Sequence, residues 1–559
     1  MEHKLHLASA VSQNGGYSRP NMSNSALITA KMGQILPVWH YACVPGDKVN
    51  VRHNQFARFE PLVVPSYVDL TYRTLTVFVP YHQVMDGAES FFANQARFKG
   101  AYNVLPVIEN ASFRELFLDT DISTSTGVTS ASFDFRDANS YYKFTSLGRY
   151  IAKVLLLLGY GWTGGDTTSG HVLTFPPKSN ALPLLSFAHA YNCYLSYSAR
   201  YNTSSLSNVL ETIKRRNQST NTISKANLKT ILTSILLTYE ESFFSSLWKY
   251  PYSAQANLQD FKDYNLETTR FIQGNGGEVS FGEALGSEFT DFNAEQVRLA
   301  MKFDDYFRRT SYGGSKDVQQ IYSRFGVKID DYRTRYPYYI GESAQQVRIG
   351  DVTSTSETTD AAIGSYAGKA ISDGSQTFDF TSNDYGMLFT FAWFAPRPTY
   401  YTGIDPEVLR LNVFDFYTPE LDKGFASLVP AELLNIQTYG RIGQAAGYAP
   451  VYSDYLYPKD YIVGDFTRFA GFEAWHFGRK PSDLGAATAQ SDALIYMPCS
   501  GTEFERIFNI IDTSAVDADT IYMDVRNEVH ATRPMKDRSG KADLGDGSID
   551  LPNMGSQVN

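Results

Sequence analysis

Residues Val68–Pro80, VDLTYRTLTVFVP, show the clearest strand pattern in the chain. In its second half, Leu75, Val77 and Val79 occupy every other position, with threonines and a phenylalanine among them. A period of two places alternate side chains on one face of a β-strand, and β-branched and aromatic residues favour strands. The stretch therefore predicts a strand with at least one face in a core.

Both ends of the chain carry further strand-like runs of this kind. They lie within Ala26–Val44, Asp47–Phe59, Tyr385–Pro396, Phe504–Ile511 and Asp519–Pro534. Runs rich in Val, Ile, Thr, Tyr and Phe, bounded by Gly, Pro, Asn or Asp, are typical of strands. The sequence thus predicts strands mainly within residues 25–80 and 385–532.

The middle of the chain has a different pattern. Apolar residues at helical spacing occur in segments 146–160, 181–201, 227–244 and 293–327, so residues 81–384 are predicted to hold mainly insertions and helices. Strands on both sides of such an interior imply a β domain whose strands meet only across a large insertion. Long insertions are also where partner contacts usually lie.

The division of the chain into domains follows from composition. A length of 559 residues would by itself suggest several domains of about 150 residues each. However, no linker, charge block or repeat period divides the chain, and its 38 Tyr and 37 Phe are spread throughout. We therefore predict one elaborated domain over residues 1–559, with 1–24 and 533–559 as terminal arms.

Charge and cysteine content exclude some classes of protein. The net charge of −10 and the pI near 5.5 argue against a surface that binds nucleic acid everywhere, but they allow a local basic patch. Cys43, Cys193 and Cys499 are far apart and odd in number, so neither a disulfide framework nor a cysteine metal site is indicated. The longest apolar run, from Val154, is too short to span a bilayer. We expect that the chain does not insert into a membrane. We also expect that it is synthesised in a reducing cytoplasm.

One segment raises the question of phosphate binding. It is Arg308–Val327, RRTSYGGSKDVQQIYSRFGV, in which Arg308 and Arg309 precede Gly313 and Gly314. A nucleotide-binding loop needs Gly, four residues and then Gly-Lys-Ser/Thr after a strand. Here the glycines are adjacent and a helical pattern precedes them, so the segment predicts two helices separated by a Gly-Gly break.

No complete catalytic constellation is visible in the sequence. The nine histidines form no His-Glu-x-x-His motif, and no Gly-x-Ser-x-Gly elbow occurs. The acid pairs Asp304-Asp305 and Asp330-Asp331 consist of adjacent residues, which point in different directions on a helix and are typical of a solvated surface. We therefore expect a protein that is not an enzyme, with no catalytic residues, metal site or cofactor.

Short motifs along nearly the whole chain point to a family. They are Val44–Asp47 (VPGD), Asn180–Pro183 (NALP), the Gly313-Gly314 break followed by SRFGV, Arg397-Pro398, and Gly464–Phe466 (GDF). In this order they resemble the major capsid proteins of the Microviridae, the small tailless icosahedral single-stranded-DNA phages, and in particular the gokushovirus-like branch. Each motif alone would be weak, but their common order is specific.

This resemblance implies a mainly β fold, namely an eight-stranded antiparallel jelly roll of the viral capsid type with long helix- and loop-containing insertions between strands. It implies a structural protein that self-assembles as the major subunit of a T=1 shell of sixty copies around circular single-stranded DNA. The expected location is the virion, after assembly in the host cytoplasm. Besides further copies and DNA, the implied partners are other viral structural proteins and a host surface receptor.

The resemblance also implies large obligate interfaces between copies, on the order of 2,000 Å² or more each. Arg308, Arg309, Gly313, Gly314 and the aromatic-rich segments are expected near these interfaces.

In the gokushovirus relatives, a long insertion that forms a surface protrusion occupies the position of residues 256–292, and here the segment is shorter. A short or absent spike is expected. The segments 205–234 and 351–378 are enlarged instead and are expected to form a different exterior feature.

Both chain ends are locally basic in an acidic protein. Between His3 and Gly46 there is no Asp or Glu at all. Packaged phosphates need lysine and arginine contacts whatever the base sequence, and unpaired bases could stack on Tyr17 or Trp39. The alternative is that both ends are peripheral tails. The candidate DNA-facing residues are Lys4, Arg19, Lys31, Arg526, Arg533, Lys536 and Arg538.

A second class of protein fits part of the pattern. A secreted carbohydrate-binding or carbohydrate-cleaving β protein would also be rich in Tyr and Trp, although the N-terminal residues lack the apolar core of a signal peptide. Electron microscopy of the expressed protein separates the two classes, because only a capsid protein forms closed particles.

Overall fold

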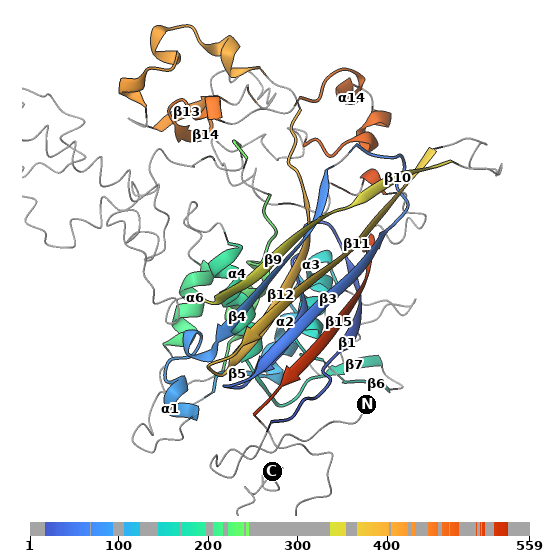
Figure 1. Ribbon diagram of the computed structural model, residues 1–559, viewed down its shortest axis with the longest axis vertical. Coiled ribbons are helices and arrows are strands. Elements are labelled where there is room, and N and C mark those ends of the chain that lie inside the picture. The colour runs from blue at the N-terminus through green and yellow to red at the C-terminus, as the bar shows by residue number, and fades with distance from the viewer. Residues whose placement is uncertain are drawn as a thin grey trace, which may run out of the picture.

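A computed structural model of the chain describes residues 17–67, 69–92, 105–122, 144–161, 163–167, 170–196, 205–215, 222–239, 242–244, 247, 336–353, 366–401, 404–422, 426–430, 433, 445–456, 461–468, 470–479, 499, 504, 506–508 and 519–534. Within these residues the fold is mainly β, with antiparallel sheets and several helices (Figure 1).

Five of the described strands form one sheet in the order β1-β15-β3-β11-β10. Their bounds are β1 (Asn24–Ala30), β15 (Ile521–Thr532), β3 (Lys48–Phe59), β11 (Tyr366–Thr381) and β10 (Arg348–Thr353). The chain ends meet in this sheet, because β1 pairs along β15 and β15 pairs along β3. Strands far apart in sequence are thus neighbours in space, which makes the topology strongly non-local.

Four described strands form the second sheet in the order β2-β12-β4-β9. They are β2 (Leu36–Cys43), β12 (Gly386–Pro396), β4 (Leu70–Pro80) and β9 (Tyr338–Gln346). The predicted strand within 68–80 is therefore an inner strand of this sheet, since β4 pairs with both β12 and β9.

The two sheets are covered differently. All but one residue of β12 is buried, whereas buried and open positions alternate along β15. Burial of both faces places β12 between two layers, while alternation leaves one face of β15 open. The helices α3 (Ser146–Leu157) and α4 (Leu182–Tyr194) supply the outer cover of the four-stranded sheet, and Phe187 of α4 stacks on Phe391 of β12 at 5.1 Å. The order of layers is five-stranded sheet, four-stranded sheet, helices (Figure 1).

Further helices pack beside α3 and α4. They are α2 (Asn110–Phe117), α6 (Ser205–Lys214) and α7 (Lys225–Thr233), and the smaller elements of this insertion are η1 (Tyr81–Gln83), α1 (Ala88–Phe92), β5 (Val107–Glu109), β6 (Thr163–Thr167), β7 (Gly170–Thr174) and β8 (Lys178–Asn180). Leu228 and Ile231 of α7 are fully buried, so this helix belongs to the core.

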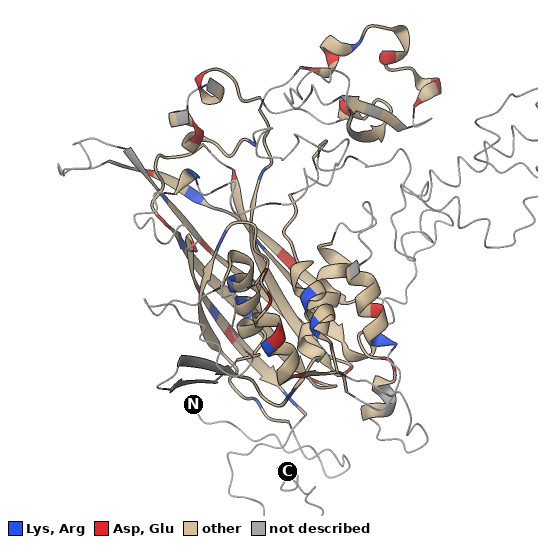
Figure 2. Cartoon of the chain, turned by 180° about the vertical axis from the view of Figure 1, so that it is seen from behind, with Lys and Arg blue, Asp and Glu red and all other residues tan. Residues whose placement is uncertain are grey.

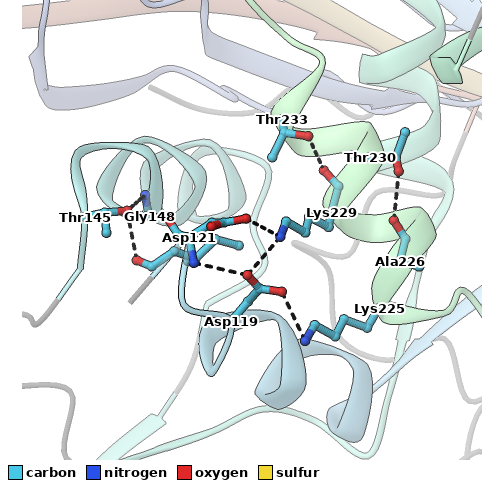
Figure 3. Close-up of polar contacts among 10 residues, drawn as sticks. Asp119, Asp121, Thr145, Gly148, Lys225, Ala226, Lys229, Thr230 and Thr233 are labelled. Atoms are coloured by element: carbon cyan, nitrogen blue, oxygen red, sulfur yellow. Dashed lines mark hydrogen bonds and ion pairs between the residues drawn. The ribbon is translucent and has the colours of Figure 1, made fainter. Parts of the chain in front are cut away.

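An ion-pair cluster fixes α7 on the end of α2 (Figure 3). Asp119 lies 3.1 Å from Lys225 Nζ and 2.9 Å from Lys229 Nζ, and Asp121 lies 2.6 Å from Lys229 Nζ. Burial alone would raise the pKa of Asp119, but hydrogen bonds from the lysines and from the Asp121 backbone bring it down to about 2. Thr145 caps α3 in the same region by accepting from the Gly148 N–H at 3.1 Å.

Short helical turns and strands follow β12. They are η4 (Pro406–Leu409), η5 (Val413–Asp415), η6 (Pro419–Leu421), β13 (Ala426–Pro430), β14 (Ala445–Pro450), η8 (Ser453–Leu456), α14 (Asp465–Arg468) and η9 (Ala470–Trp475). They lie beyond one end of the sheets (Figure 1), joined there by the Tyr67 N–H, which donates to the Trp475 carbonyl at 2.8 Å.

Most of the predicted strands are confirmed. Strands occur within 26–44, 47–59, 68–80, 385–396 and 519–534, the helices α3 and α4 lie within predicted helical segments, and α7 overlaps the predicted segment 227–244. The helix-break-helix predicted for 293–327 lies outside the described residues.

The structure departs from three expectations. The range 81–384, expected to hold mainly insertions and helices, also contains the sheet strands β9, β10 and β11. Within the segment 351–378, residues 366–378 belong to an inner strand, since β11 pairs along β3, while residues 354–365 lie outside the described part of the chain. The predicted strand at 504–511 is a 3₁₀ turn with one bridge residue, Phe508, at the positions that are described.

The composition of β11 explains why it was missed. Its inward positions carry Gly368, Ala370, Ser372, Gly374 and Gln376, which have no hydrophobic alternation. At Gly374 an added Cβ would lie 1.5 Å from the side chain of Gln345 on β9. Glycine at this position therefore leaves room for the Gln345 side chain between the two sheets.

Candidate functional site

The candidate site begins where the two described chain ends meet. Ser18 and Arg533 exchange backbone hydrogen bonds of 2.9 Å in both directions, and the Met22 N–H donates to the Val529 carbonyl at 3.1 Å. The segment before β1 therefore continues alongside the end of β15. Residues from both predicted basic ends are brought together at this end of the sandwich.

Arg533 binds within the chain at this junction. Its Nε and Nη2 each lie 3.1 Å from Asp47 Oδ2, and Asp47 has no exposed surface. The guanidinium also lies 4.7 Å from the ring centre of Tyr41 and donates to the Ala42 carbonyl. A buried carboxylate needs such a partner, so Arg533 pairs a charge inside the fold rather than offering one to a ligand.

The VPGD turn holds Asp47 in place. The Val44 N–H donates to Asp47 Oδ2 at 3.0 Å, and the Gly46 N–H donates to the Ser382 carbonyl at 2.7 Å. Gly46 has φ of +91°, a left-handed conformation that glycine adopts without a Cβ penalty. The motif is thus a structural turn between β2 and β3.

The remaining basic candidates differ in accessibility. Arg19 is exposed near the β15 end, and Arg526 is exposed on the outer face of β15, where it pairs with Asp524 at 3.0 Å. Lys31 is buried, with 9% of its surface exposed, close to Lys153, whose pKa is lowered by burial. Lys4, Lys536 and Arg538, and the interface candidates Arg308, Arg309, Gly313 and Gly314, lie outside the described residues.

The two aromatic candidates for base stacking differ in exposure, since one is buried and the other is partly exposed. Trp39 is only 3% exposed and packs against Tyr41, His53 and Phe378, so the expectation that it stacks on a base was wrong for the free chain. Tyr17 is 45% exposed beside the junction of the chain ends.

An aromatic hollow that the sequence analysis missed opens at the same end. It encloses about 320 Å³ and is lined by Pro45, Tyr81, His82, Ala88, Phe92, Asp384 and Tyr385. Phe92 stacks on Tyr385 with ring centres 4.4 Å apart, and both rings are partly exposed. His82 Nδ1 lies 2.9 Å from Asp384. Partly exposed aromatic rings are the kind of side chain on which unpaired bases can stack.

A polar network joins the two sheets inside the sandwich. His53 of β3 contacts Asn527 of β15 through Nδ1 and Thr390 of β12 through Nε2, the latter at 2.8 Å. Thr390 in turn lies 3.1 Å from Thr76 of β4. Burial lowers the pKa of His53 to about 4, against the opposing effect of the Asn527 hydrogen bond. The imidazole is therefore neutral at physiological pH and acts as a fixed hydrogen-bonding group.

A second part of this network lies nearer β9. Gln55 Nε2 donates to Gln345 at 3.0 Å and to Ser372 at 2.9 Å, and Thr74 donates to Gln376 at 2.7 Å. Buried hydrogen bonds of this kind favour one arrangement of the strands, since any slip leaves their polar groups unpaired. The network therefore fixes how the sheets lie on each other. Polar residues at inward positions of a strand were the sequence signal for it.

Two further observations concern the described residues only. No group of three or more His, Cys, Asp or Glu side chains lies together as a metal site would require. No described helix is long and apolar enough to cross a membrane.

Taken together, two packed antiparallel sheets, a polar network that fixes their packing, and long insertions with exposed surfaces define a structural β-sandwich protein. Comparison with known families makes the class specific. The family described as capsid protein (F protein) matches residues 11–114 and 178–540, which is most of the chain. The chain belongs to the capsid protein (F protein) family, and the resemblance drawn from its motifs is confirmed.

Individual relatives agree with this family. The chain is 25% identical over 204 residues to capsid protein VP1 of Chlamydia phage 1, covering 34% of each chain. It is 27% identical over 211 residues to capsid protein VP1 of Bdellovibrio phage phiMH2K, which covers 35% of this chain and 39% of the relative. It is 21% identical over 198 residues to capsid protein VP1 of Spiroplasma virus 4, which covers 34% of this chain and 36% of the relative. The chain thus matches somewhat more than a third of the length of these relatives.

Proposed function

We propose that the chain is the major capsid subunit of a small phage, and that sixty copies close a T=1 icosahedral shell around circular single-stranded DNA. The observation that carries the proposal is the match of 11–114 and 178–540 to the capsid protein (F protein) family. Icosahedral symmetry offers sixty equivalent positions, so one kind of subunit suffices for the smallest shell.

The strand order supports a jelly roll of the viral capsid type. If β1, β2, β3, β4, β9, β11, β12 and β15 are numbered one to eight, the sheets have the orders 1-8-3-6 and 2-7-4-5, with β10 added at an edge. In such an order most successive strands alternate between the sheets, which is how an eight-stranded roll is wound from two Greek keys. The roll and its insertions form one domain under this proposal.

The two longest insertions supply the area for contacts between copies. One lies between β4 and β9 and holds the helices, and the other lies between β12 and β15. Interfaces in closed shells are obligate, so each buries on the order of 2,000 Å² or more in total. Arg308, Arg309, Gly313 and Gly314 belong to the first insertion and remain the proposed interface residues there.

DNA is proposed to contact the end of the sandwich where the chain ends meet. Arg19 and Tyr17 are exposed there, and Arg526 is exposed on β15. Lys4, Lys536 and Arg538 belong to the same two chain ends in the sequence. The role needs charge and stacking surface rather than a catalytic site, so no enzymatic activity is proposed. Other viral structural proteins and a host receptor are proposed as further partners.

Expression of the chain together with the other virion genes of its phage tests the proposal. Sedimentation and negative-stain electron microscopy should show closed particles of one size that contain this chain. Monomers that bind glycans on an array, with no closed particles, would instead favour a carbohydrate-binding protein.

A further inference from the structure

The insertion after β12 carries an unusual amount of exposed apolar surface. We call residues 404–422, 445–456, 461–468 and 470–475 the loop platform. Thirteen large apolar side chains of the platform are exposed, and Leu411, Val413 and Phe414 are 84%, 79% and 72% exposed. The others are Ile404, Val408, Phe416, Tyr417, Tyr455, Leu456, Tyr461, Val463, Phe466 and Phe472.

Internal contacts hold the platform in this shape. The guanidinium of Arg410 lies 3.9 Å from the ring centre of Tyr455 and pairs with Asp454 and Glu407. The Asp415 carboxylate accepts from the backbone N–H groups of Leu411 and Asn412 at 2.8 and 2.7 Å. The turns therefore use their polar groups internally and leave their apolar side chains facing outward.

The two halves of the platform are also tied together. The Tyr452 hydroxyl donates to the Phe414 carbonyl at 3.0 Å, and the Tyr461 hydroxyl donates to Asp405 at 2.5 Å. These bonds connect 404–422 to both 445–456 and 461–468, so the exposed side chains lie on segments that are held together.

The exposed area exceeds what a free-standing protein usually shows. A side chain of this size presents on the order of 150–250 Å² when fully open, so thirteen partly open ones expose on the order of 1,000 Å² or more. Monomeric proteins rarely show an apolar patch beyond about 300–600 Å². A stable interface needs roughly 800 Å² from each partner, so the platform is large enough to be one side of it.

We propose that the loop platform docks on a neighbouring copy of this chain and is buried when the shell closes, an inference that rests on the proposed capsid function. A second copy is the occupant because the family assembles through its own subunits and the area matches an obligate contact. The neighbour presents a different face rather than its own platform.

The acidic character of the platform supports a contact with a different face of the neighbouring copy. Within the platform residues the sequence has eight Asp and Glu against two Lys and Arg. Figure 2 shows the acidic positions in red along these elements. Two platforms facing each other would oppose like charges, which is unfavourable across an interface. A head-to-tail contact, as in a ring around a symmetry axis, avoids this and closes readily.

A matched pair of variants tests the inference. Leu411→Ser changes a platform residue that is 84% exposed, and Leu27→Ser changes a residue on β1 that is 87% exposed outside the platform. Each is expressed with the other virion genes, and the yield of closed particles is measured by sedimentation. The triple variant Leu411→Ser, Val413→Ser, Phe414→Ser should lower the yield at least tenfold, the single Leu411→Ser several-fold, and Leu27→Ser less than twofold. The thermal melting of the free chain should stay unchanged in all three, because the side chains are exposed before assembly.

Hydrogen exchange of the unmodified chain gives a second measurement. Amides of 408–417 should exchange at least tenfold more slowly in particles than in free subunits. Unchanged exchange there, or normal particle yield from the triple variant, overturns the platform contact while leaving the capsid function intact. A wild-type chain that stays monomeric under all assembly conditions overturns both proposals.

Discussion

At the scale of single residues, the pair of Arg533 and Asp47 joins the end of β15 to the turn between β2 and β3. Arg533→Gln should leave the fully buried Asp47 carboxylate without its charge partner. Removing one partner of a buried ion pair costs about 3–5 kcal/mol, so the free energy of unfolding of the free chain should fall by that amount. Chemical denaturation of the free chain measures it.

Arg526→Gln is the control for this prediction. Arg526 is 71% exposed in its pair with Asp524, and such surface pairs contribute about 0–1 kcal/mol. Equal stability of the Arg533 variant and the control would contradict the structural role of Arg533 and return it to the DNA-facing candidates.

The buried His53 predicts a pH dependence of stability. Its pKa in the folded chain is about 4, below the ordinary value of 6.5, because burial disfavours the charged ring. As pH falls below 6.5 the unfolded chain binds a proton that the folded chain excludes, so stability falls until the pH reaches about 4 and then levels off. Between pH 7 and 4.5 this amounts to about 2 kcal/mol.

The comparison of wild type with His53→Gln isolates this contribution. Unfolding free energies at both pH values should show a loss between pH 7 and 4.5 that is about 2 kcal/mol smaller in the variant. Equal losses in the two proteins would mean that the pKa of His53 is the same in the folded and the unfolded chain.

At the scale of elements, β12 is buried at all but one position, and Gly386 begins it. An added Cβ there would lie 2.4 Å from the Val79 carbonyl and 2.6 Å from the Phe78 ring. Gly386→Ala should therefore destabilise the free chain by about 1–3 kcal/mol, as overpacking does. Gly350→Ala on β10 is the control, since nothing lies within 4 Å of its Cβ, and it should change stability by less than about 0.5 kcal/mol. Thermal unfolding of both variants checks this, and similar melting temperatures would refute it.

Elements with a hydrophobic period could be predicted from the sequence, and elements built on polar contacts could not. The alternation in 68–80 and 519–534 revealed β4 and β15, because each strand has one buried face that is mostly apolar. β11 faces inward with Gly, Ser and Gln, which interact with side chains of β3, β4 and β9 that are distant in sequence. The role of Arg533 could not be predicted for the same reason. Its basic neighbours in the sequence predicted a surface role, but its partner Asp47 lies almost the whole chain away in sequence.

At the scale of the whole molecule, the junction of the chain ends predicts which basic residues affect DNA packaging. Lys4→Gln, Arg19→Gln, Lys536→Gln and Arg538→Gln combined should give closed particles with less DNA or with DNA released at lower salt, because fewer phosphates are neutralised. Absorbance ratios and salt titration of purified particles measure this. Full DNA content with unchanged salt sensitivity would assign the two ends to peripheral tails.

Assembly of the whole molecule follows from the capsid function: copies of this one sandwich should close an icosahedral shell. Cryo-electron microscopy of particles formed by the wild-type chain measures this. The reconstruction should contain sixty copies related by icosahedral symmetry, each with two sheets in the orders β1-β15-β3-β11-β10 and β2-β12-β4-β9. Open filaments, rings without icosahedral symmetry, or a shell whose subunits have another strand order would contradict it.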